Sequence, residues 1–388
     1  MTVETAGMPE AVITEAMIES MRQRIGVELR IDECINNDIA TRLSIARFAA
    51  GIGDTNPLWT DPASAGASLL GGLVAPPTWV LCCFSGLQFG WPGLGSFHAS
   101  SDLRFHRLVR EGDRIVPTCT YEGFDGPQPS RFAARMVIDR FLNRYTNQRD
   151  ELVAEVHWKV WNFERQTARG KGDGAALEVP HRWTEEEVAG IEADCRAERV
   201  RGATPRFWED VSIGDELDPL TKGPVGTTDE VAFVASGAAP IPRLAAHRAA
   251  LDLYDRHPAW SFRDSLTGAR EPIYAVHYNR EAARAMGVSM QYDVGFQRQC
   301  WQIHLGTSWM GDDAWIKRAS AQYRSFVYLG DVIRLGGVVT GKSVDDDGEA
   351  VVAIRTHARN QRGDDVMPGE LVVALPSRLG EGSPVLAR

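Results

Sequence analysis

The sequence repeats itself weakly, and this repeat limits the possible folds more than any other feature. A glycine-led strand followed by a helix-like run spans residues 26–51, and the same pattern returns at 214–237. A strand that ends in a Gly-Asp turn spans 103–115, and its counterpart spans 321–333. We therefore expect two similar units, each built from a helix and antiparallel strands joined by short turns.

Alternating or β-branched runs follow each Gly-Asp turn and predict the strands of both units. Each unit also contains one further apolar stretch of helical length, at 78–88 in the first unit and at 296–307 in the second. An antiparallel sheet wrapped around one buried helix is an α+β arrangement. The predicted strands lie at 114–121, 132–141, 152–163, 332–340, 350–360 and 371–375.

The chain of 388 residues is long enough for two domains. We expect the first unit at residues 1–165 and the second at 207–388. Between them, residues 166–206 form a polar stretch rich in charge, Gly and Ala. This stretch is predicted to be an ordered surface linker in which Thr184 opens a helix with a capping box.

Composition and motif content exclude several classes of protein. The net charge is −10 and the basic residues are dispersed, which argues against a nucleic-acid partner. No run reaches the roughly 20 apolar residues that span a bilayer, and residues 1–10 do not resemble a signal peptide. We therefore expect a cytoplasmic protein with no membrane partner. The six cysteines form no C-x-x-C pair and no nucleotide or metal motif is found, so no cofactor and no metal are expected.

Residues 50–61 carry the most specific motif, Ala-Gly-Ile-Gly-Asp-Thr-Asn-Pro-Leu-Trp-Thr-Asp. It resembles the G-D-x-N-P-x-H-x-D signature of the MaoC-like dehydratases and type 2 enoyl-CoA hydratases. Residues 71–78 and 101–107 are similar to the fungal fatty-acid-synthase dehydratase region. The resemblance implies a double hotdog, in which two antiparallel sheets each wrap around a central helix. Relative to that family, residues from about 238 to 270 are an insertion.

The resemblance also implies a reaction, the reversible addition of water to a 2-enoyl thioester. An aspartate and a histidine of the family handle the water and the transferred proton. Backbone N–H groups, one of them at a helix N-terminus, hold the thioester oxygen. Each half of this chain can be compared with these requirements, because proton transfer needs an acid/base pair and the oxyanion needs donors.

The first half keeps only part of the pattern. Asp54 and Asn56 match the family, but Trp59 stands at the histidine position, and indole does not exchange a proton at neutral pH. The oxyanion glycine of the family falls eighteen residues later, where this chain has Pro77, which has no N–H. Asp54 and Asn56 are therefore candidate site residues, with turn and helix capping as the alternative.

The second half loses the opposite part. His277 keeps the downstream spacing of the family, and Gly295 follows eighteen residues later. Pro272 replaces the aspartate, so Glu271 or a carboxylate of the insertion is expected to substitute for it. The alternatives are a core histidine at 277 and a glycine that only starts a helix at 295. The insertion contributes the carboxylates of Asp252, Asp255 and Asp264.

Four further features are interpreted from the sequence. His304 lies inside a predicted buried helix and is interpreted as a satisfied core histidine. Asp293 is either a substitute acid or, by preference, a helix cap. Residues 345–348 are predicted to form a hairpin turn. A positive rim for coenzyme A phosphates was predicted from Arg104, Arg107, Arg324 and Lys317.

The leading hypothesis is a hydratase or dehydratase that acts on an acyl-CoA or acyl-carrier-protein thioester, with its working site in the second half. One alternative is a non-catalytic acyl-thioester-binding subunit that partners a smaller active hotdog protein. Another is an isomerase or cyclase on the same scaffold. A homodimer or a hotdog hetero-oligomer is expected, and the acyl group and the direction of the reaction stay open.

Overall fold

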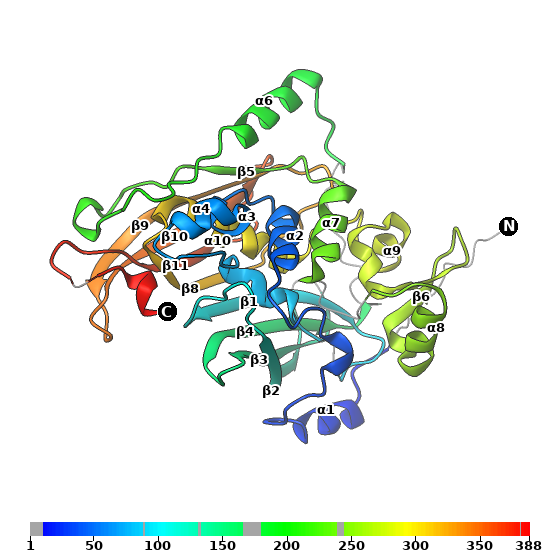
Figure 1. The fold of residues 1–388 in the computed structure, drawn as a ribbon. Helices are drawn as coiled ribbons and strands as arrows, with labels where there is room; N and C mark the ends of the chain where they lie inside the picture. The colour runs from blue at the N-terminus through cyan, green and yellow to red at the C-terminus, as the bar shows by residue number, and fades with distance from the viewer. Residues whose placement is uncertain (1–10, 88–89, 131–132, 166–179, 239–243, 381) are drawn as a thin grey trace.

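One antiparallel sheet of nine strands is the scaffold in the computed structural model, which describes residues 11–87, 90–130, 133–165, 180–238, 244–380 and 382–388. The strand order is β2-β3-β4-β1-β8-β11-β10-β9-β5, and a separate hairpin pairs β6 with β7 (Figure 1). The strands are β1 (Gly95–Phe105), β2 (Ile115–Gln128), β3 (Met136–Asn147), β4 (Leu152–Phe163), β5 (Leu220–Lys222), β6 (Ser261–Arg263), β7 (Arg270–Pro272), β8 (Trp315–Gln322), β9 (Ile333–Val344), β10 (Ala350–Asn360) and β11 (Gly369–Ala374).

The six runs predicted as strands lie on β2, β3, β4, β9, β10 and β11. The runs on β4 and β10 agree with the structure at both ends. Burial alternates along these strands, as expected for a sheet with one face against the core. The predicted turn at 345–348 connects β9 to β10. The α+β double hotdog prediction is confirmed.

The two halves meet where β1 pairs with β8. The register runs from Ser100 opposite Gln322 to Arg104 opposite Arg318. Arg318 crosses this seam and makes two hydrogen bonds to the Asp102 carboxylate, at 2.8 and 2.7 Å. The halves therefore share one continuous sheet, and β1 of the first half borders the second half directly.

Nine α-helices are found in the described part of the chain, and α10 lies deepest. Residues 296–307 of α10 are all buried, which confirms the predicted apolar helix of the second unit. Its polar side chains are held by partners: Gln302, for example, donates to Thr356 at 2.8 Å. The helices are α1 (Glu15–Arg22), α2 (Arg42–Ile52), α3 (Pro57–Thr60), α4 (Pro62–Ala67), α6 (Glu185–Arg196), α7 (Thr227–Phe233), α8 (His247–Arg256), α9 (Arg280–Ala285) and α10 (Gly295–Met310).

The helix predicted at 78–88 is wrong. The chain makes a short 3-10 segment there, η2 (Pro77–Cys82), and residues 84–87 are not helical. An α-helix would need the carbonyls of this segment for its own N–H groups. Instead, Asn37 donates to the Cys82 carbonyl and Tyr145 donates to that of Phe84. At Gly86, φ is +151° and an added Cβ would lie 2.6 Å from the Trp158 ring, so the backbone leaves the helical path at this residue.

The connecting segments agree with the predictions where they are described. Thr184 caps α6 with a capping box, as expected for the linker helix. The insertion carries α8 and the β6-β7 hairpin, which lie together at one side of the molecule (Figure 1). Residues 166–179 and 239–243 lie outside the described residues. The domain boundaries at 165, 206 and 238–270 stay predictions.

Candidate functional site

His277 lies close to the start of α10. It ends the 3-10 segment η7 (Ile273–His277), and its Nδ1 lies 2.8 Å from the Tyr292 carbonyl oxygen. A carbonyl only accepts, so Nδ1 carries the proton and Nε2 of the neutral ring offers a lone pair. Burial lowers the pKa of His277 to about 4, against the opposing effect of the Tyr292 and Asp293 backbone. The imidazole is therefore neutral at physiological pH and has the tautomer of a general base.

Gly295 is the first residue of α10. The preceding residue, Val294, is the N-cap, and no side chain caps the helix there. The first N–H groups of a helix lack intrahelical acceptors, so this end is suited to hold an anion or a polarised carbonyl. Gly295 is also partly accessible to solvent, as is His277. The structure thus brings the two predicted residues of the second half to the same end of α10.

His98 is a residue at this end of α10 that the sequence reasoning missed. It comes from β1 of the first half, and its ring packs against Gly295, where an added Cβ would lie 2.8 Å from His98 Nδ1. Its Nε2 is buried and has no hydrogen-bond partner among the described residues. Burial lowers the pKa of His98 to about 3, so this second imidazole is also neutral. The alternation of residues along a strand does not show which strand lies beside it, so the sequence could not show that β1 borders the second half.

Glu230 is a second missed residue. It lies on α7, is fully buried, and has the Val294 backbone N–H as a hydrogen-bond donor. Burial raises its pKa well above the usual range, and the nearby Asp293 adds to this. With its amide turned to satisfy both groups, Gln297 donates to both carboxylate oxygens at 3.0 and 3.1 Å. A buried carboxylate therefore lies beside the start of α10, on the helix that repeats α2.

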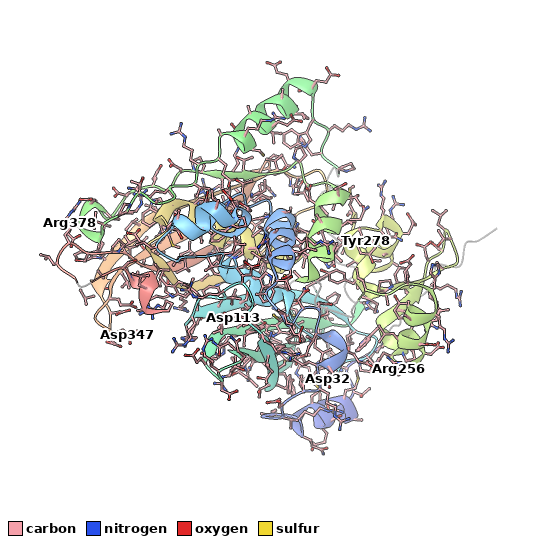
Figure 2. All side chains as sticks on the ribbon, viewed as in Figure 1. Asp32, Asp113, Arg256, Tyr278, Asp347 and Arg378 are labelled. Carbon is pink, nitrogen blue, oxygen red and sulfur yellow. The ribbon has the colours of Figure 1, made fainter. Side chains whose placement is uncertain are left out.

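Tyr274 adds an uncommitted hydroxyl to the same region. Its ring centroid lies 4.6 Å from that of His277, and its buried hydroxyl has no partner among the described residues. Burial and the proximity of Glu230 raise its pKa well above the usual range, so the phenol stays protonated. Tyr274, His277 and Glu230 thus give this end of α10 a donor, a base and a carboxylic acid. In Figure 2 the neighbouring Tyr278 marks this region beside α7 and α9.

The carboxylates suggested by the sequence have mostly local roles. Asp264 accepts hydrogen bonds from Asn279 and from the turn that follows it. Asp255 pairs with Arg270 at 2.6 Å, and Asp252 lies 3.6 Å from Arg248. Glu271 lies on β7, just before η7, and burial raises its pKa. Glu271 stays a prediction as the substitute carboxylate.

Asp293 does not cap α10, contrary to the preferred interpretation. Its carboxylate forms a two-bond ion pair with Arg298, at 2.6 and 2.9 Å, and both side chains are buried. Arg298 also donates to the backbone carbonyls of Ser325 and Val366. A buried guanidinium is costly without a carboxylate partner, so Asp293 pairs with Arg298 and does not cap α10.

The signature motif of the first half makes local hydrogen bonds. Asp54 accepts from the Asn56 N–H at 3.0 Å, and Asn56 accepts from the Leu58 N–H at 2.9 Å and so caps α3. Both side chains are buried. These bonds describe the capping alternative.

His304, in the middle of α10, also lies close to Asp54. Nε2 of His304 lies 3.4 Å from Asp54 and 2.5 Å from Glu198, and the His304 side chain is fully buried. Lys222 lies 3.6 Å from Glu198 and donates to the Gly53 carbonyl at 2.9 Å. Burial acts to raise the pKa of Glu198, but His304 and Lys222 lower it overall. We call Asp54, Glu198, Lys222 and His304 the buried charge cluster.

The buried charge cluster explains His304 beyond the sequence interpretation. The residue is in the core, as expected, but carboxylates from two other segments lie close to its ring. Asp54 comes from the signature motif and Glu198 from the chain after α6, whereas His304 lies in the middle of α10. The signature aspartate therefore contacts the central helix of the other half.

A pocket lies beside the signature motif of the first half. It contains about 570 Å³ of space, counted with the part that is open to solvent, and its lining is mainly apolar. Asn56, Trp59 and Pro77 line one side, and residues from the C-terminal end of α10 line another. The two replacements that remove the acid/base and oxyanion groups thus lie on the wall of a pocket.

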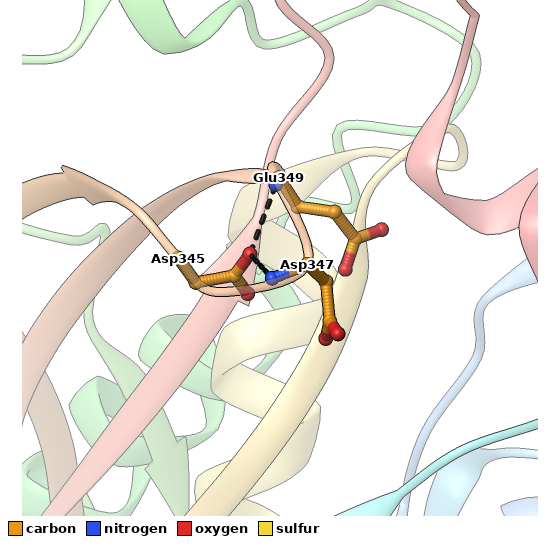
Figure 3. Close-up of side chains that lie close together, drawn as sticks. All are labelled: Asp345, Asp347 and Glu349. Carbon is orange, nitrogen blue, oxygen red and sulfur yellow. Dashed lines mark hydrogen bonds between the residues drawn. The ribbon is translucent and has the colours of Figure 1, made fainter.

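The acidic turn between β9 and β10 is the group of carboxylates most suited to a metal in the described part of the chain. Asp345, Asp347 and Glu349 each offer an oxygen within 4.8 Å of the others (Figure 3). However, Lys317 donates to all three, at 2.8 Å to Asp347 and 2.7 Å to Glu349. These bonds raise the pKa of Lys317. Its ammonium group supplies the positive charge that a metal cation would otherwise bring. Asp347 and Tyr278 lie at opposite sides of the view in Figure 2.

The predicted positive rim is wrong for Lys317, because the acidic turn engages its ammonium group. Arg104 and Arg107 face Asp102 and Glu151 at 4.0 and 3.5 Å. Arg324 is exposed and donates to Gln322 at 3.4 Å. Arg104 and Arg107 thus each have a carboxylate nearby, whereas the positive rim itself stays a prediction for the three arginines.

The sequence has relatives of known family. Residues 25–156 match the family described as FAS1-like, dehydratase domain region. A UPF0336 protein of Parafrankia sp. (strain EAN1pec) is 35% identical over 122 residues, which are 29% of this chain and 77% of that protein. A UPF0336 protein of Streptomyces avermitilis is 36% identical over 89 residues, which are 21% of this chain. The match covers 59% of the length of that second relative.

Solved structures resemble almost the whole chain. A MaoC-like dehydratase superposes with a TM-score of 0.61 at 16% identity, over 92% of this chain and 100% of that one. A protein of Mycobacterium tuberculosis described as having a double hotdog fold gives a TM-score of 0.53 at 13% identity, over 90% of this chain and 96% of that one. At such low identity these likenesses concern the fold alone.

The family match and the fold agree with each other. The chain belongs to the family of the UPF0336 proteins, its residues 25–156 match the FAS1-like dehydratase domain region, and its fold is that of the double hotdog proteins. The match to the dehydratase region supports activity of the hydratase or dehydratase kind in general terms. Among the described helices, none has the length and apolar character needed to cross a bilayer.

Proposed function

We propose that the protein adds water to, or removes it from, a 2-enoyl or 3-hydroxyacyl thioester, and that the reaction takes place at the N-terminal end of α10. The observation that carries this proposal is the placement of His277. Its Nδ1 is bound by the Tyr292 carbonyl three residues before Gly295 starts the helix. A proton acceptor and a set of helix N–H donors are the two groups that this chemistry requires.

The proposed reaction uses His277 twice. In hydration, Nε2 takes a proton from water as the water oxygen bonds to C3 of the enoyl thioester. The carbonyl oxygen gains negative charge as the enolate forms, and the Gly295 N–H stabilises it. The imidazolium then returns its proton to C2, so the water adds across the double bond without an outside acid. Dehydration runs through the same steps in reverse.

Glu230 supports this proposal as the carboxylate of the site, with Glu271 as the other candidate. Glu230 is buried beside the helix start and is bound by the Val294 N–H. Glu271 is only partly buried, on the β6-β7 hairpin. Glu271 directly precedes Pro272 on β7, whereas Glu230 lies on α7. The carboxylate would therefore come from the neighbouring position or from another element.

Turnover of trans-2-enoyl-CoA and trans-2-enoyl thioesters of a carrier protein tests the proposal. Loss of the conjugated thioester absorbance would be followed for wild type, His277→Gln and Asp54→Asn, with circular dichroism as the check on folding. We expect His277→Gln to lower kcat by at least about 100-fold, the usual contribution of a general base. We expect Asp54→Asn to keep most of the turnover. Loss of turnover in Asp54→Asn alone would place the reaction in the first half.

A second candidate function is a non-catalytic subunit that binds acyl thioesters beside a smaller active hotdog partner. It is favoured by Trp59 and Pro77 in the first half and by Pro272 in the second, because each removes a group that the reaction uses. Light scattering of the purified chain would show whether it pairs with itself. Co-purification of a stable partner, together with no turnover by the chain alone, would support this second candidate. An isomerase or cyclase would give a product without added water.

A further inference from the structure

The carbonyl that binds His277 belongs to a peptide group that is held on both sides. The Tyr292 oxygen lies 2.8 Å from His277 Nδ1, and the N–H of the same peptide group, that of Asp293, donates to the Val327 carbonyl at 2.9 Å. Tyr292 also forms an isolated antiparallel bridge with Tyr328. The imidazole is therefore connected through one peptide group to the chain that follows β8.

A buried ion pair between Asp293 and Arg298 spans the start of α10. The carboxylate accepts two hydrogen bonds from the guanidinium, at 2.6 and 2.9 Å, and the side chains are 0% and 4% exposed. Asp293 directly precedes the N-cap Val294, and Arg298 is the fourth residue of the helix, so Gly295 lies inside the loop that the pair closes. A two-bond arginine–carboxylate pair fixes orientation as well as distance.

The same arginine also binds the chain that follows β8. Its Nη1 donates to the Ser325 carbonyl at 2.9 Å and to the Val366 carbonyl at 3.1 Å. Ser325 lies two residues before Val327, the acceptor of the Asp293 N–H. One short stretch of chain therefore holds both members of the ion pair, Arg298 through its side chain and Asp293 through its backbone.

Stability alone does not call for such a pair. Burying two charges costs hydration free energy, and replacing a buried ion pair by apolar residues of similar volume is often neutral or stabilising. A two-bond pair does supply one defined geometry, and here that geometry joins the acceptor of the His277 proton to the helix end that carries Gly295. Groups that act together on one substrate need such a fixed separation, because a misplacement of about 1 Å can cost about 100-fold in rate.

We propose that Asp293 and Arg298 are positioning residues of the site at the start of α10. Their ion pair holds the Tyr292 carbonyl, and through it the His277 imidazole, in a fixed place relative to the Gly295 N–H. Both side chains are buried, so they act through these groups and not by contact with a substrate. The effect on turnover rests on the proposed function, whereas the effect on the His277 ring does not.

The ring nitrogens of His277 test the positioning without any substrate. Nuclear magnetic resonance of protein labelled with 15N-histidine distinguishes the two neutral tautomers, and the signals that His277→Gln removes assign the ring. We expect wild type to show Nδ1 protonated and Nε2 unprotonated. Arg298→Lys keeps the positive charge, but a single ammonium group does not reproduce the planar fork. In this variant the two nitrogen signals should move toward the average of both tautomers.

Turnover of trans-2-enoyl-CoA gives the second measurement. Arg298→Lys should lower kcat by about 10-fold to 100-fold and change KM by less than about twofold, since positioning acts on the reacting groups and not on uniform binding. Arg318→Lys is the matched control, because it breaks another two-bond arginine–aspartate pair, with Asp102 at the seam between the halves. It should leave the His277 signals and kcat unchanged.

The two measurements separate the positioning from the proposed reaction. Moved His277 signals in Arg298→Lys, with no turnover even in wild type, would support the positioning and reject the reaction. Unchanged signals in the folded variant, an equal change in Arg318→Lys, or a wild-type ring without the Nδ1-protonated tautomer would overturn the positioning. If circular dichroism shows that Arg298→Lys does not fold, Asp293→Glu takes its place with the same expected results, because it keeps both charges and displaces the carboxylate by one methylene group.

Discussion

Asp54 shows how one residue can keep its identity while its surroundings change its task. In the family pattern this aspartate works with a histidine five residues later, and here that position is Trp59. The structure gives Asp54 a different histidine, His304, from the central helix of the other half. Lys222 and Glu198 complete the cluster. The aspartate thus connects the signature motif to α10.

The buried charge cluster predicts a stability effect for Asp54→Asn. The substitution keeps the shape of the side chain but removes a buried charge that faces His304. We expect the free energy of unfolding to fall by about 1–3 kcal/mol, since a buried ionic group loses its counter-charge. Urea unfolding would measure it. Asp61→Asn is the control in the same motif, because Asp61 is exposed and asparagine caps a helix as well as aspartate. Equal stability of both variants would contradict the prediction.

At the scale of the secondary-structure elements, α10 organises the molecule. Its N-terminal end faces His277, Glu230 and His98, and its C-terminal end faces the pocket beside Trp59. The first half has only the short η2 in the corresponding place. One long central helix therefore serves both halves. A glycine near each end of its buried stretch allows close contacts, at Gly295 with His98 and at Gly306 with Leu371.

These two glycines allow a matched test of the site on α10. An added Cβ would lie 2.8 Å from His98 in Gly295→Ala and 2.8 Å from Leu371 in Gly306→Ala. Both variants should lose about 1–3 kcal/mol of stability from overpacking, less what alanine adds to helix propensity. Only Gly295→Ala should also lose turnover: alanine keeps the N–H, but its Cβ meets the His98 ring and displaces the start of α10 at the proposed reaction site. Equal turnover in the two variants would show that displacing this end of α10 does not affect the reaction.

A second substitution checks the steric cause. His98→Ala removes the ring that a Cβ at residue 295 would meet, so the double variant should recover most of the stability lost in Gly295→Ala. Residues in contact commonly show such coupling. Equal stability of Gly295→Ala in the presence and absence of the His98 ring would show that the loss has another origin.

At the scale of the whole molecule, the two halves are joined by more than the sheet. His98 of β1 packs against α10, and Arg318 of β8 binds Asp102 of β1. The buried charge cluster adds contacts from residues 54, 198 and 222 to His304. We therefore expect the described halves to unfold together, and conditions that weaken the seam to weaken the whole protein.

Low pH is one such condition, and we expect the contribution of His98 to stability to depend on pH. The folded-state pKa of His98 is about 3, below the value of about 6.5 in an unfolded chain. Between these values the unfolded chain binds a proton that the folded chain excludes, so this contribution to stability is complete above about pH 6.5 and falls as the pH falls. His98→Asn removes it. Relative to wild type, the variant should gain up to about 2 kcal/mol between pH 7.5 and pH 5.

Urea unfolding at both pH values measures this difference. His257→Asn is the control, because His257 is partly exposed and lies 2.9 Å from Glu33 on the surface. Other titrating groups change the stability of all three proteins alike, so only the difference from wild type is informative. An identical pH dependence for wild type and His98→Asn would contradict the assignment of a buried, neutral imidazole.

The sequence by itself determined the fold class and most of the sheet. Alternation of apolar residues is a local signal, and it predicted β4 and β10 to the residue and α10 to within three residues at each end. The spacing of His277 and Gly295 selected two residues that the structure places at one end of one helix. The repeat and the motif at 50–61 identified the family.

Only the tertiary structure decided which residues meet. The helix predicted at 78–88 failed because distant donors, such as Asn37 and Tyr145, take its carbonyls. His98 and Glu230 join the candidate site from other elements, and His304 pairs with Asp54 across 250 positions of sequence. Such contacts depend on strand order and helix placement, which periodicity does not encode. The local sequence pattern therefore determined the helices and strands. Packing between the two halves determined which side chains meet at the candidate site.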